Sequence, residues 1–237
     1  MEKISTQNYE KYIKALSDIS SAITSDLYLE DILKLIVMVT AKVTGLEICS
    51  LWLLDETENP RKIRLKATQS IDPEYMKDRA LIETEGVVGY VFSKNEPLYV
   101  KDVLKDQRFK EKDMARKLGL VSMLGIPLRV KNDKVIGVLN CFSSQPHDFT
   151  DTEINLITAV ANQAAVAIFN TELLVKSKVI QEELETRKLV EKAKDVLMSK
   201  RKMAGDEAFR WIQKRSMTSR KSMRQIAEAI LLSQELG

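Results

Sequence analysis

The stretch that decides the fold of this chain is SMLGIPLRVKNDKVIGVLN, residues 122–140. Apolar residues occupy every second position of its first half, which is the period of a strand with one buried face: Leu124, Ile126, Leu128 and Val130. Asn132 and Asp133 then favour a turn, and a second apolar run extends from Val135 to Phe142. Gly137 inside that run permits a close backbone or ligand approach. The stretch predicts two antiparallel strands joined by a tight turn.

Helices are expected before this hairpin, with further strands between. One helix should cover residues 5–24, with an apolar face of Tyr12, Leu16, Ile19 and Ile23. A second should run over 29–43 and end at Gly45. Strand-like runs follow at 47–54 and at 63–67, where Ile63, Leu65 and Ala67 alternate with polar residues, and 86–92 resembles a short helix. This order predicts an α+β fold with a mostly antiparallel sheet.

The chain changes character at Thr150. Thr150 or Asp151 can cap a helix, and helical patterning without Gly or Pro then persists almost to Met203. That length predicts a coiled-coil-like connector in its middle. Its seam is imperfect, because Leu173, Ile180 and Leu184 keep heptad spacing whereas Ser177 and Arg187 occupy the other seam positions. An adjustable dimer contact fits this pattern, and a long helix packed on its own domain is the alternative.

Two shorter helices are predicted to finish the chain. Asp206 is the expected N-cap of the first, which carries Phe209 on its apolar face. Ser219 or Ser222 is the expected N-cap of the second. A three-helix unit of this size has a small core, so we expect it to pack on the connector or on a second subunit.

The charge of the chain is unevenly distributed. Residues 186–237 contain 13 Lys and Arg against 6 Asp and Glu, although the net charge of the whole chain is only +3. A basic tail behind an acidic remainder points to a polyanionic partner, and a solvated Lys-rich surface is the alternative.

Composition also indicates the compartment. Cys49 and Cys141 lie in apolar, strand-like runs, which favours buried thiols in a reducing compartment over a disulfide or a metal site. No apolar stretch approaches the roughly 18 residues that span a bilayer, and the N-terminus lacks the apolar run of a signal peptide. These features predict a cytoplasmic protein without a membrane partner.

Three segments in order resemble a GAF domain, and the resemblance covers residues 27–172. They are EGVVGYVFSKNEPLYVKDVLKDQRF (85–109), the hairpin at 122–140, and HDFTDTEINLITAVANQAAVAIFN (147–170). The resemblance implies a sensor that holds a small molecule or cofactor between the sheet and an overlying helix and loops. The residues expected to line that pocket, which could instead simply fill a core, are Trp52, Leu54, Ala67, Val87, Val88, Phe109, Met123 and Phe142.

The familiar ligand signatures of GAF domains are missing from this sequence. The Asn-Lys-Phe-Asp-Glu constellation of the cyclic-nucleotide type is not found, and His147, the single histidine, cannot form a metal site by itself. Cys49 and Cys141 match neither the bilin-attachment position nor the reactive set of the methionine-sulfoxide-reducing type. No cofactor or metal is therefore assigned. With no nucleophile–base constellation and no phosphate-binding glycine loop, we expect a protein that is not an enzyme.

The stretch AKDVLMSKRKMAGDEAFRWIQKRSMTSRKSMRQIAEAI, residues 193–230, resembles an ANTAR domain. The residues that carry the match are Ala193, Lys194, Leu197, Met198, Ala208, Phe209, Ile226 and Ala227. Asp195 and Ser216 depart from the family pattern, which commonly has Gly and Ala there, but both substitutions are tolerated in helices. The resemblance implies that this unit binds tandem hairpins with short loops in nascent RNA and so prevents formation of a terminator.

RNA binding of that kind needs cations for phosphates and planar or hydrogen-bonding groups for loop bases. The candidate residues form two basic clusters and one hydroxyl at a helix N-terminus: Lys194, Lys200, Arg201 and Lys202; Lys214, Arg215, Arg220, Lys221 and Arg224; and Ser222. Phe209 is expected in the core. Trp211 either stacks on a base or packs against the connector.

The sequence thus predicts four parts: an N-terminal helix (1–26), a GAF sensor domain (27–172), a connector (173–189) and an ANTAR domain (190–237). The expected function is transcription antitermination by a homodimer that responds to a small molecule. The alternative is a DNA-binding or protein-docking regulator whose GAF domain is structural and holds no ligand.

Overall fold

The computed structural model describes residues 13, 14, 17, 21, 28–70 and 79–235. The chain divides into two compact units, residues 1–172 and residues 173–237. The apolar face predicted for the N-terminal helix, Tyr12, Leu16, Ile19 and Ile23, lies outside the described residues.

The first unit contains a six-stranded sheet whose neighbouring strands all pair antiparallel, in the order β3-β2-β1-β6-β5-β4. The strands are β1 (Ile48–Asp55), β2 (Lys62–Thr68), β3 (Ala80–Ile82), β4 (Leu98–Val100), β5 (Ser122–Arg129) and β6 (Val135–Ser143). The predicted hairpin is confirmed as β5 and β6, joined by the short 3-10 turn Lys131–Asp133. Asn132 and Asp133 both have positive φ there, which Asn and Asp tolerate better than most residues.

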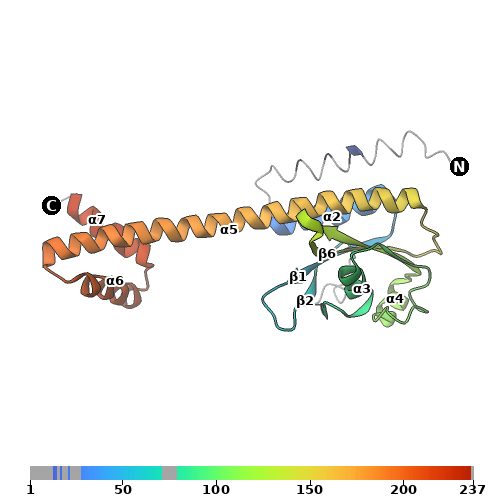
Figure 1. The fold of residues 1–237 in the computed structure, drawn as a ribbon, viewed down its shortest axis with the longest axis horizontal. Helices are drawn as coiled ribbons and strands as arrows, with labels where there is room; N and C mark the ends of the chain where they lie inside the picture. Colours follow the sequence, from blue (N-terminus) through green and yellow to red (C-terminus); the bar gives the residue numbers. More distant parts are fainter. Residues whose placement is uncertain (1–12, 15–16, 18–20, 22–27, 71–78, 236–237) are drawn as a thin grey trace. The chain divides into compact units, whose positions relative to one another are not determined.

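Helices cover both faces of this sheet (Figure 1). Helix α2 (Leu29–Thr44) and the first part of α5 (Asp151–Arg201) pack on one face, and α3 (Gly86–Lys94) and α4 (Lys112–Leu118) lie on the other. Helix α2 ends as predicted at Gly45, which has φ 72° and donates its N–H to Ala41 O at 2.8 Å. The α+β prediction is confirmed.

A β-bulge in β2 divides its apolar residues between the two faces. Leu51 pairs with Ala67 and Trp52 pairs with Leu65, so Lys66 is an extra residue without a counterpart in β1. Because side chains alternate along a strand, one extra residue reverses the face of everything beyond it. Ala67 therefore belongs to the core under α2 and α5, whereas Leu65 packs in the core under α3.

The first part of α5 is strongly apolar. Thr150 caps it as predicted: Thr150 N donates to Glu153 Oε2 at 2.8 Å, and Glu153 N donates to Thr150 Oγ1 at 3.3 Å. An 18-residue window of α5 has a mean hydropathy of 1.2, long and apolar enough to cross a membrane, contrary to the sequence expectation. Of that window 39% is buried, and the buried part includes apolar residues that pack against the sheet: Ile157, Val160, Ala161, Ala164, Ala165 and Ile168.

The second unit consists of the rest of α5, α6 (Gly205–Ser219) and α7 (Met223–Glu235). Its core is small, as predicted from its size: Val190, Ala193, Leu197, Ala208, Ile212, Ile226 and Ala227. The prediction that Asp206 caps α6 is wrong. The N-cap of α6 is Ala204, two residues earlier, and the carboxylate of Glu207 accepts the Ala204 N–H at 3.1 Å.

The second possible cap, Ser222, is confirmed for α7. Gln225 N donates to Ser222 Oγ at 3.2 Å, and Ser222 N donates to Gln225 Oε1 at 3.0 Å. This reciprocal pair satisfies two backbone donors at the start of the helix.

Candidate functional sites

A small cavity of about 20 Å³ lies between the sheet and α3. Six of the eight residues predicted to line a ligand pocket line it: Trp52, Val87, Val88, Phe109, Met123 and Phe142. Leu54 packs against the same core without lining the cavity. The prediction for Ala67 is wrong, because the bulge at Lys66 turns Ala67 to the other face of the sheet. A cavity of this volume accommodates about one water molecule, so a larger ligand requires the site to open.

Asn140 of β6 is one of the polar residues of this cavity that sequence reasoning missed, together with Lys110 and Glu111. Its side chain is 2% exposed, and its Oδ1 has no hydrogen-bond partner among the described residues. A buried carbonyl oxygen of this kind costs free energy unless a donor reaches it. The available signal was a single amide within the run Val138–Phe142, whose other members are apolar.

An ion pair also borders the cavity. Glu111, which lines it, accepts a hydrogen bond from Arg79 Nη1 at 2.6 Å. Burial raises the pKa of Glu111, and the positive charge of Arg79 acts in the opposite direction. The cavity therefore combines an apolar wall, an unpartnered acceptor and a partly desolvated carboxylate.

The loop between β4 and α4 is held by aspartate turns. Asp102 Oδ1 accepts the Leu104 N–H at 3.0 Å, and Asp106 Oδ1 accepts the Arg108 N–H at 2.8 Å. Arg108 also donates to the Asp106 carboxylate through Nε at 3.0 Å and Nη2 at 2.6 Å. The hydrogen bonds from Arg108 lower the pKa of Asp106. Both aspartates therefore stabilise turns in this loop.

Cys49 and Cys141 are free, fully buried thiols, as predicted, but they are also neighbours. They are directly opposed on β1 and β6, with their Sγ atoms 3.5 Å apart. The contact with Cys141 and burial raise the pKa of the Cys49 thiol well above its ordinary range. A buried thiol with a raised pKa is a poor nucleophile, so Cys49 has the character of a core residue. Within the described residues, no group of three or more metal-ligating side chains comes together.

The basic residues of the second unit are regrouped by the fold. Lys200 and Arg201 of α5 line one pocket together with Trp211 and Arg215 of α6. The guanidinium carbon of Arg201 lies 4.9 Å from the centre of the Trp211 ring. Sequence order had assigned Arg215 to a cluster with Arg220 and Lys221, but the turn of α6 places it with the end of α5.

Two of the predicted RNA contacts are already engaged with carboxylates. Lys194 pairs with Glu191 at 2.8 Å. Arg224 pairs with Glu228 at 3.0 Å and with Glu185 at 3.6 Å, and these carboxylates raise its pKa. The other predicted contact residues are exposed: Lys200, Arg201, Lys202, Lys214, Arg215, Arg220, Lys221 and Ser222.

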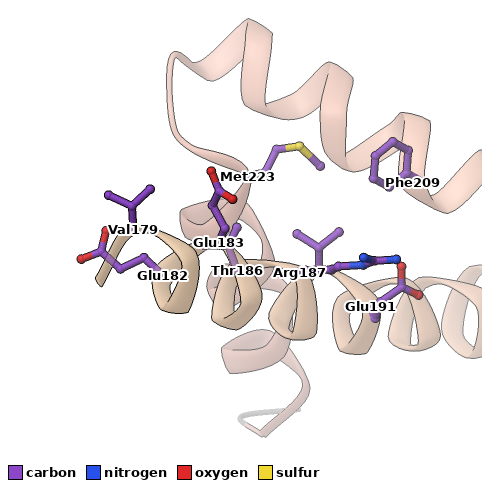
Figure 2. Close-up of a pocket in the computed structure, with 9 residues that line it drawn as sticks. Val179, Glu182, Glu183, Thr186, Arg187, Glu191, Phe209 and Met223 are labelled. Carbon is purple, nitrogen blue, oxygen red and sulfur yellow. The ribbon is translucent and has the colours of Figure 1, made fainter. Parts of the chain in front are cut away.

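A larger groove of about 630 Å³ lies between α5, α6 and α7 (Figure 2). Phe209 and Met223 lie across it from Arg187 and Glu191 of α5. The prediction that Phe209 is a core residue is wrong, since its side chain is 40% exposed in this groove. Glu182 and Glu183 also line the groove, so its carboxylates outnumber its single arginine.

The part of α5 that precedes and borders this groove carries exposed apolar side chains. The seam residues Leu173, Ile180 and Leu184 are all about half or more exposed, and Leu174, Val175 and Val179 are exposed beside them. An apolar stripe of this length on a solvated helix is typical of a helix that pairs with another.

Fold and sequence together define the class of protein. The chain belongs to the GAF domain family, whose model matches residues 28–168, and residues 178–231 match the ANTAR domain model. Both resemblances found in the sequence are thereby confirmed.

Individual relatives agree with this assignment. The GAF domain of an Acinetobacter phosphoenolpyruvate-protein phosphotransferase superimposes with a TM-score of 0.59 at 26% identity, covering 72% of this chain and 97% of that chain. The free methionine-R-sulfoxide reductase of Neisseria meningitidis superimposes with a TM-score of 0.58 over 73% of this chain and 97% of its own. At 17% identity, this second likeness shows the fold alone.

Similarity to a curated protein is confined to part of the chain. The transcriptional regulatory protein PdtaR of Mycobacterium tuberculosis is 40% identical over 79 residues, which are 32% of this chain. The match spans only 38% of the length of PdtaR.

Proposed function

We propose that this chain is a cytoplasmic, non-enzymatic regulator of transcription that acts as a homodimer. Its ANTAR domain binds tandem hairpins in nascent RNA, and a small molecule in the GAF cavity controls that binding. The observation that carries the RNA-binding half is the gathering of Lys200, Arg201 and Arg215 around Trp211 in the unit that matches the ANTAR model. The similarity to PdtaR, a transcriptional regulatory protein, supports the same assignment.

The charge pattern supports a polyanion as the partner. Exposed cations of the ANTAR unit can neutralise phosphates and release their counterions, which makes affinity fall with salt. RNA is favoured over duplex DNA because a half-buried aromatic beside exposed cations suits unpaired loop bases, which a regular duplex does not present. Lys194 and Arg224 contribute less than the exposed cations that form no ion pair within the described part of the chain, since each would first have to leave a carboxylate.

Filter binding with the tandem hairpins of the protein's own operon leader tests this proposal. Arg220→Ala should weaken binding and reduce the salt slope by about one. Lys176→Ala, which removes an exposed cation of α5 outside the ANTAR match, is the matched control and should leave both unchanged. Tighter binding to duplex DNA than to hairpins would favour a DNA-binding regulator, and no binding to either would favour a protein-docking one.

The cavity under α3 supports the sensing half. Asn140 Oδ1 calls for an N–H or O–H donor, and the apolar wall formed by Trp52 and Phe142 suits a ligand with one polar edge. At about 20 Å³ the cavity is closed, so a ligand would select a state in which α3 or the adjoining loop has moved.

The presence of a ligand can be tested directly. Protein purified from its native host should release a stoichiometric small molecule on denaturation, detected by mass spectrometry. The Asn140→Leu variant, purified in the same way, is the control and should release much less. A structural GAF domain would release nothing in either case.

We expect helix α5 to couple ligand binding in the GAF cavity to RNA binding by the ANTAR domain. Its first part packs on the sheet, and its last turns form the ANTAR core, with no interruption between them. A ligand that altered the packing of α5 on the sheet would change how the exposed seam at Leu173, Ile180 and Leu184 pairs with a second copy. The pairing of two ANTAR units, and with it the spacing of two hairpins, would follow.

A further inference from the structure

A second pocket of the ANTAR unit, about 280 Å³ in volume, has a composition unlike that of the acidic groove. We call it the Trp211 pocket. Its floor is aliphatic, from Leu197 of α5 and Ile226 and Ile230 of α7, and Trp211 of α6 forms one wall. Its rim carries Lys200, Arg201 and Arg215, and none of the described residues that line it is acidic.

Helical spacing holds these groups in place. Trp211 and Arg215 are four residues apart and share one face of α6, as Leu197 and Arg201 do on α5. The indole is half-buried against the small core, and the Arg201 guanidinium covers part of it at 4.9 Å. The aromatic wall is therefore fixed by packing, whereas its arginine cover is an exposed and flexible side chain.

The two pockets differ in which ligand they can accept. The acidic groove is larger, but Glu182, Glu183 and Glu191 would repel a phosphate that entered it. The Trp211 pocket joins a flat aromatic wall to three cations, which is the combination that holds an unstacked base and the phosphates beside it.

We infer that the Trp211 pocket receives one unstacked base from the loop of the bound RNA. The base stacks on the indole of Trp211, and the Arg201 guanidinium leaves the ring to bind a phosphate next to that base. Lys200 and Arg215 hold the backbone on either side. This inference rests on the proposed binding of RNA hairpins and names the place where one loop base is read.

An abasic scan combined with two variants tests the inference. Tandem-hairpin RNA is prepared with an abasic site at each loop position in turn, and affinities are measured for the full-length protein. One position should cost the wild type about tenfold, within the range that loss of one base–aromatic stack produces. Trp211→Leu should bind intact RNA about tenfold more weakly and lose nothing further at that position. Trp211→Phe, which keeps a ring, should retain most of the affinity.

A fluorescence measurement keeps the test valid if Trp211→Leu does not fold. 2-Aminopurine is placed at the sensitive loop position, and its emission should be quenched on binding to the wild type. The Trp211 emission, obtained as the difference between wild type and Trp211→Phe, should be quenched in the same titration. Trp52 lies in the sheet and is common to both proteins.

The outcomes separate the two proposals. One outcome is that the wild type binds the hairpins while the affinity loss from Trp211→Leu multiplies with the affinity loss from an abasic site at every loop position. That result overturns the base pocket alone. Quenching of neither fluorophore overturns it as well. A wild type that does not prefer hairpins over scrambled loops overturns the RNA-binding function and the base pocket together.

Discussion

Replacement of Asn140 by leucine should stabilise the ligand-free protein while it abolishes the response to the ligand. The two side chains are similar in size, and Asn140 is 2% exposed. Its Oδ1 is desolvated without a partner among the described residues, a situation that costs about 1–3 kcal/mol. Leucine removes that cost and adds apolar surface beside Trp52 and Phe142. We therefore expect the free energy of unfolding of the GAF unit to rise by about 1–3 kcal/mol.

Differential scanning calorimetry of the ligand-free protein measures this change. For a domain of this size, about 1 kcal/mol shifts Tm by roughly 2–4 °C, so the GAF transition should move up by about 2–12 °C. Asn140→Ala is the control, because it also removes the amide but leaves space, and its Tm should fall below that of the leucine variant. A leucine variant that melts below the wild type would show that Oδ1 is well bonded in the folded protein and would refute the reasoning.

Three further predictions concern the framework around the sites. Gly137→Ala should destabilise the protein by about 3 kcal/mol in urea unfolding, because an added Cβ would lie 2.8 Å from Leu53 Cδ2 and closer still to the Trp52 carbonyl. The control is Gly45→Ala, which has φ 72° but open space around it and should cost only about 1 kcal/mol. Asp106→Asn should cost about 1–2 kcal/mol at pH 7. Because the folded-state pKa of Asp106 is lowered, that difference should shrink as the pH falls below the ordinary value of 3.8, and a constant difference would contradict it. Leu184→Lys should convert dimer to monomer in sedimentation velocity, and an unchanged dimer would exclude the seam as the interface.

Much of the fold follows from local pattern. The alternation in 122–130 located β5, the Asn132–Asp133 turn located the hairpin, and Gly45 marked the end of α2. Each depends on residues close in sequence, where backbone preference and burial agree. The cavity wall followed instead from the resemblance to GAF domains, which predicted that Trp52, Val88 and Phe142 line a pocket between the sheet and the overlying helix.

The remaining features depend on partners far away in the chain. Ala67 was assigned to the wrong face because the bulge at Lys66 arises from pairing with β1, and β2 alone carries no mark of it. Asn140 could be recognised as buried only once both faces of its strand were covered. Arg215 joins Lys200 and Arg201 through the packing of α6 on α5, which the order of charges along the chain does not reveal.

Phe209 is a residue for which the local sequence pattern predicted burial and the structure shows exposure. Its apolar type and helical spacing suggested the core, yet a three-helix unit has too little interior to bury every apolar side chain. Its exposure in a groove lined by glutamates is a property of the assembled helices.

The opposed thiols of Cys49 and Cys141 allow local opening of the GAF unit to be measured by thiol labelling. They lie under α2 and α5 on adjacent strands, so a thiol reagent reaches them only when that layer lifts. The rate of labelling under native conditions then measures the free energy of this local opening, without any engineered probe. If occupancy of the cavity changes how α5 rests on the sheet, the labelling rate should change with it, and the same two sulfur atoms would read out the first step of signal transfer.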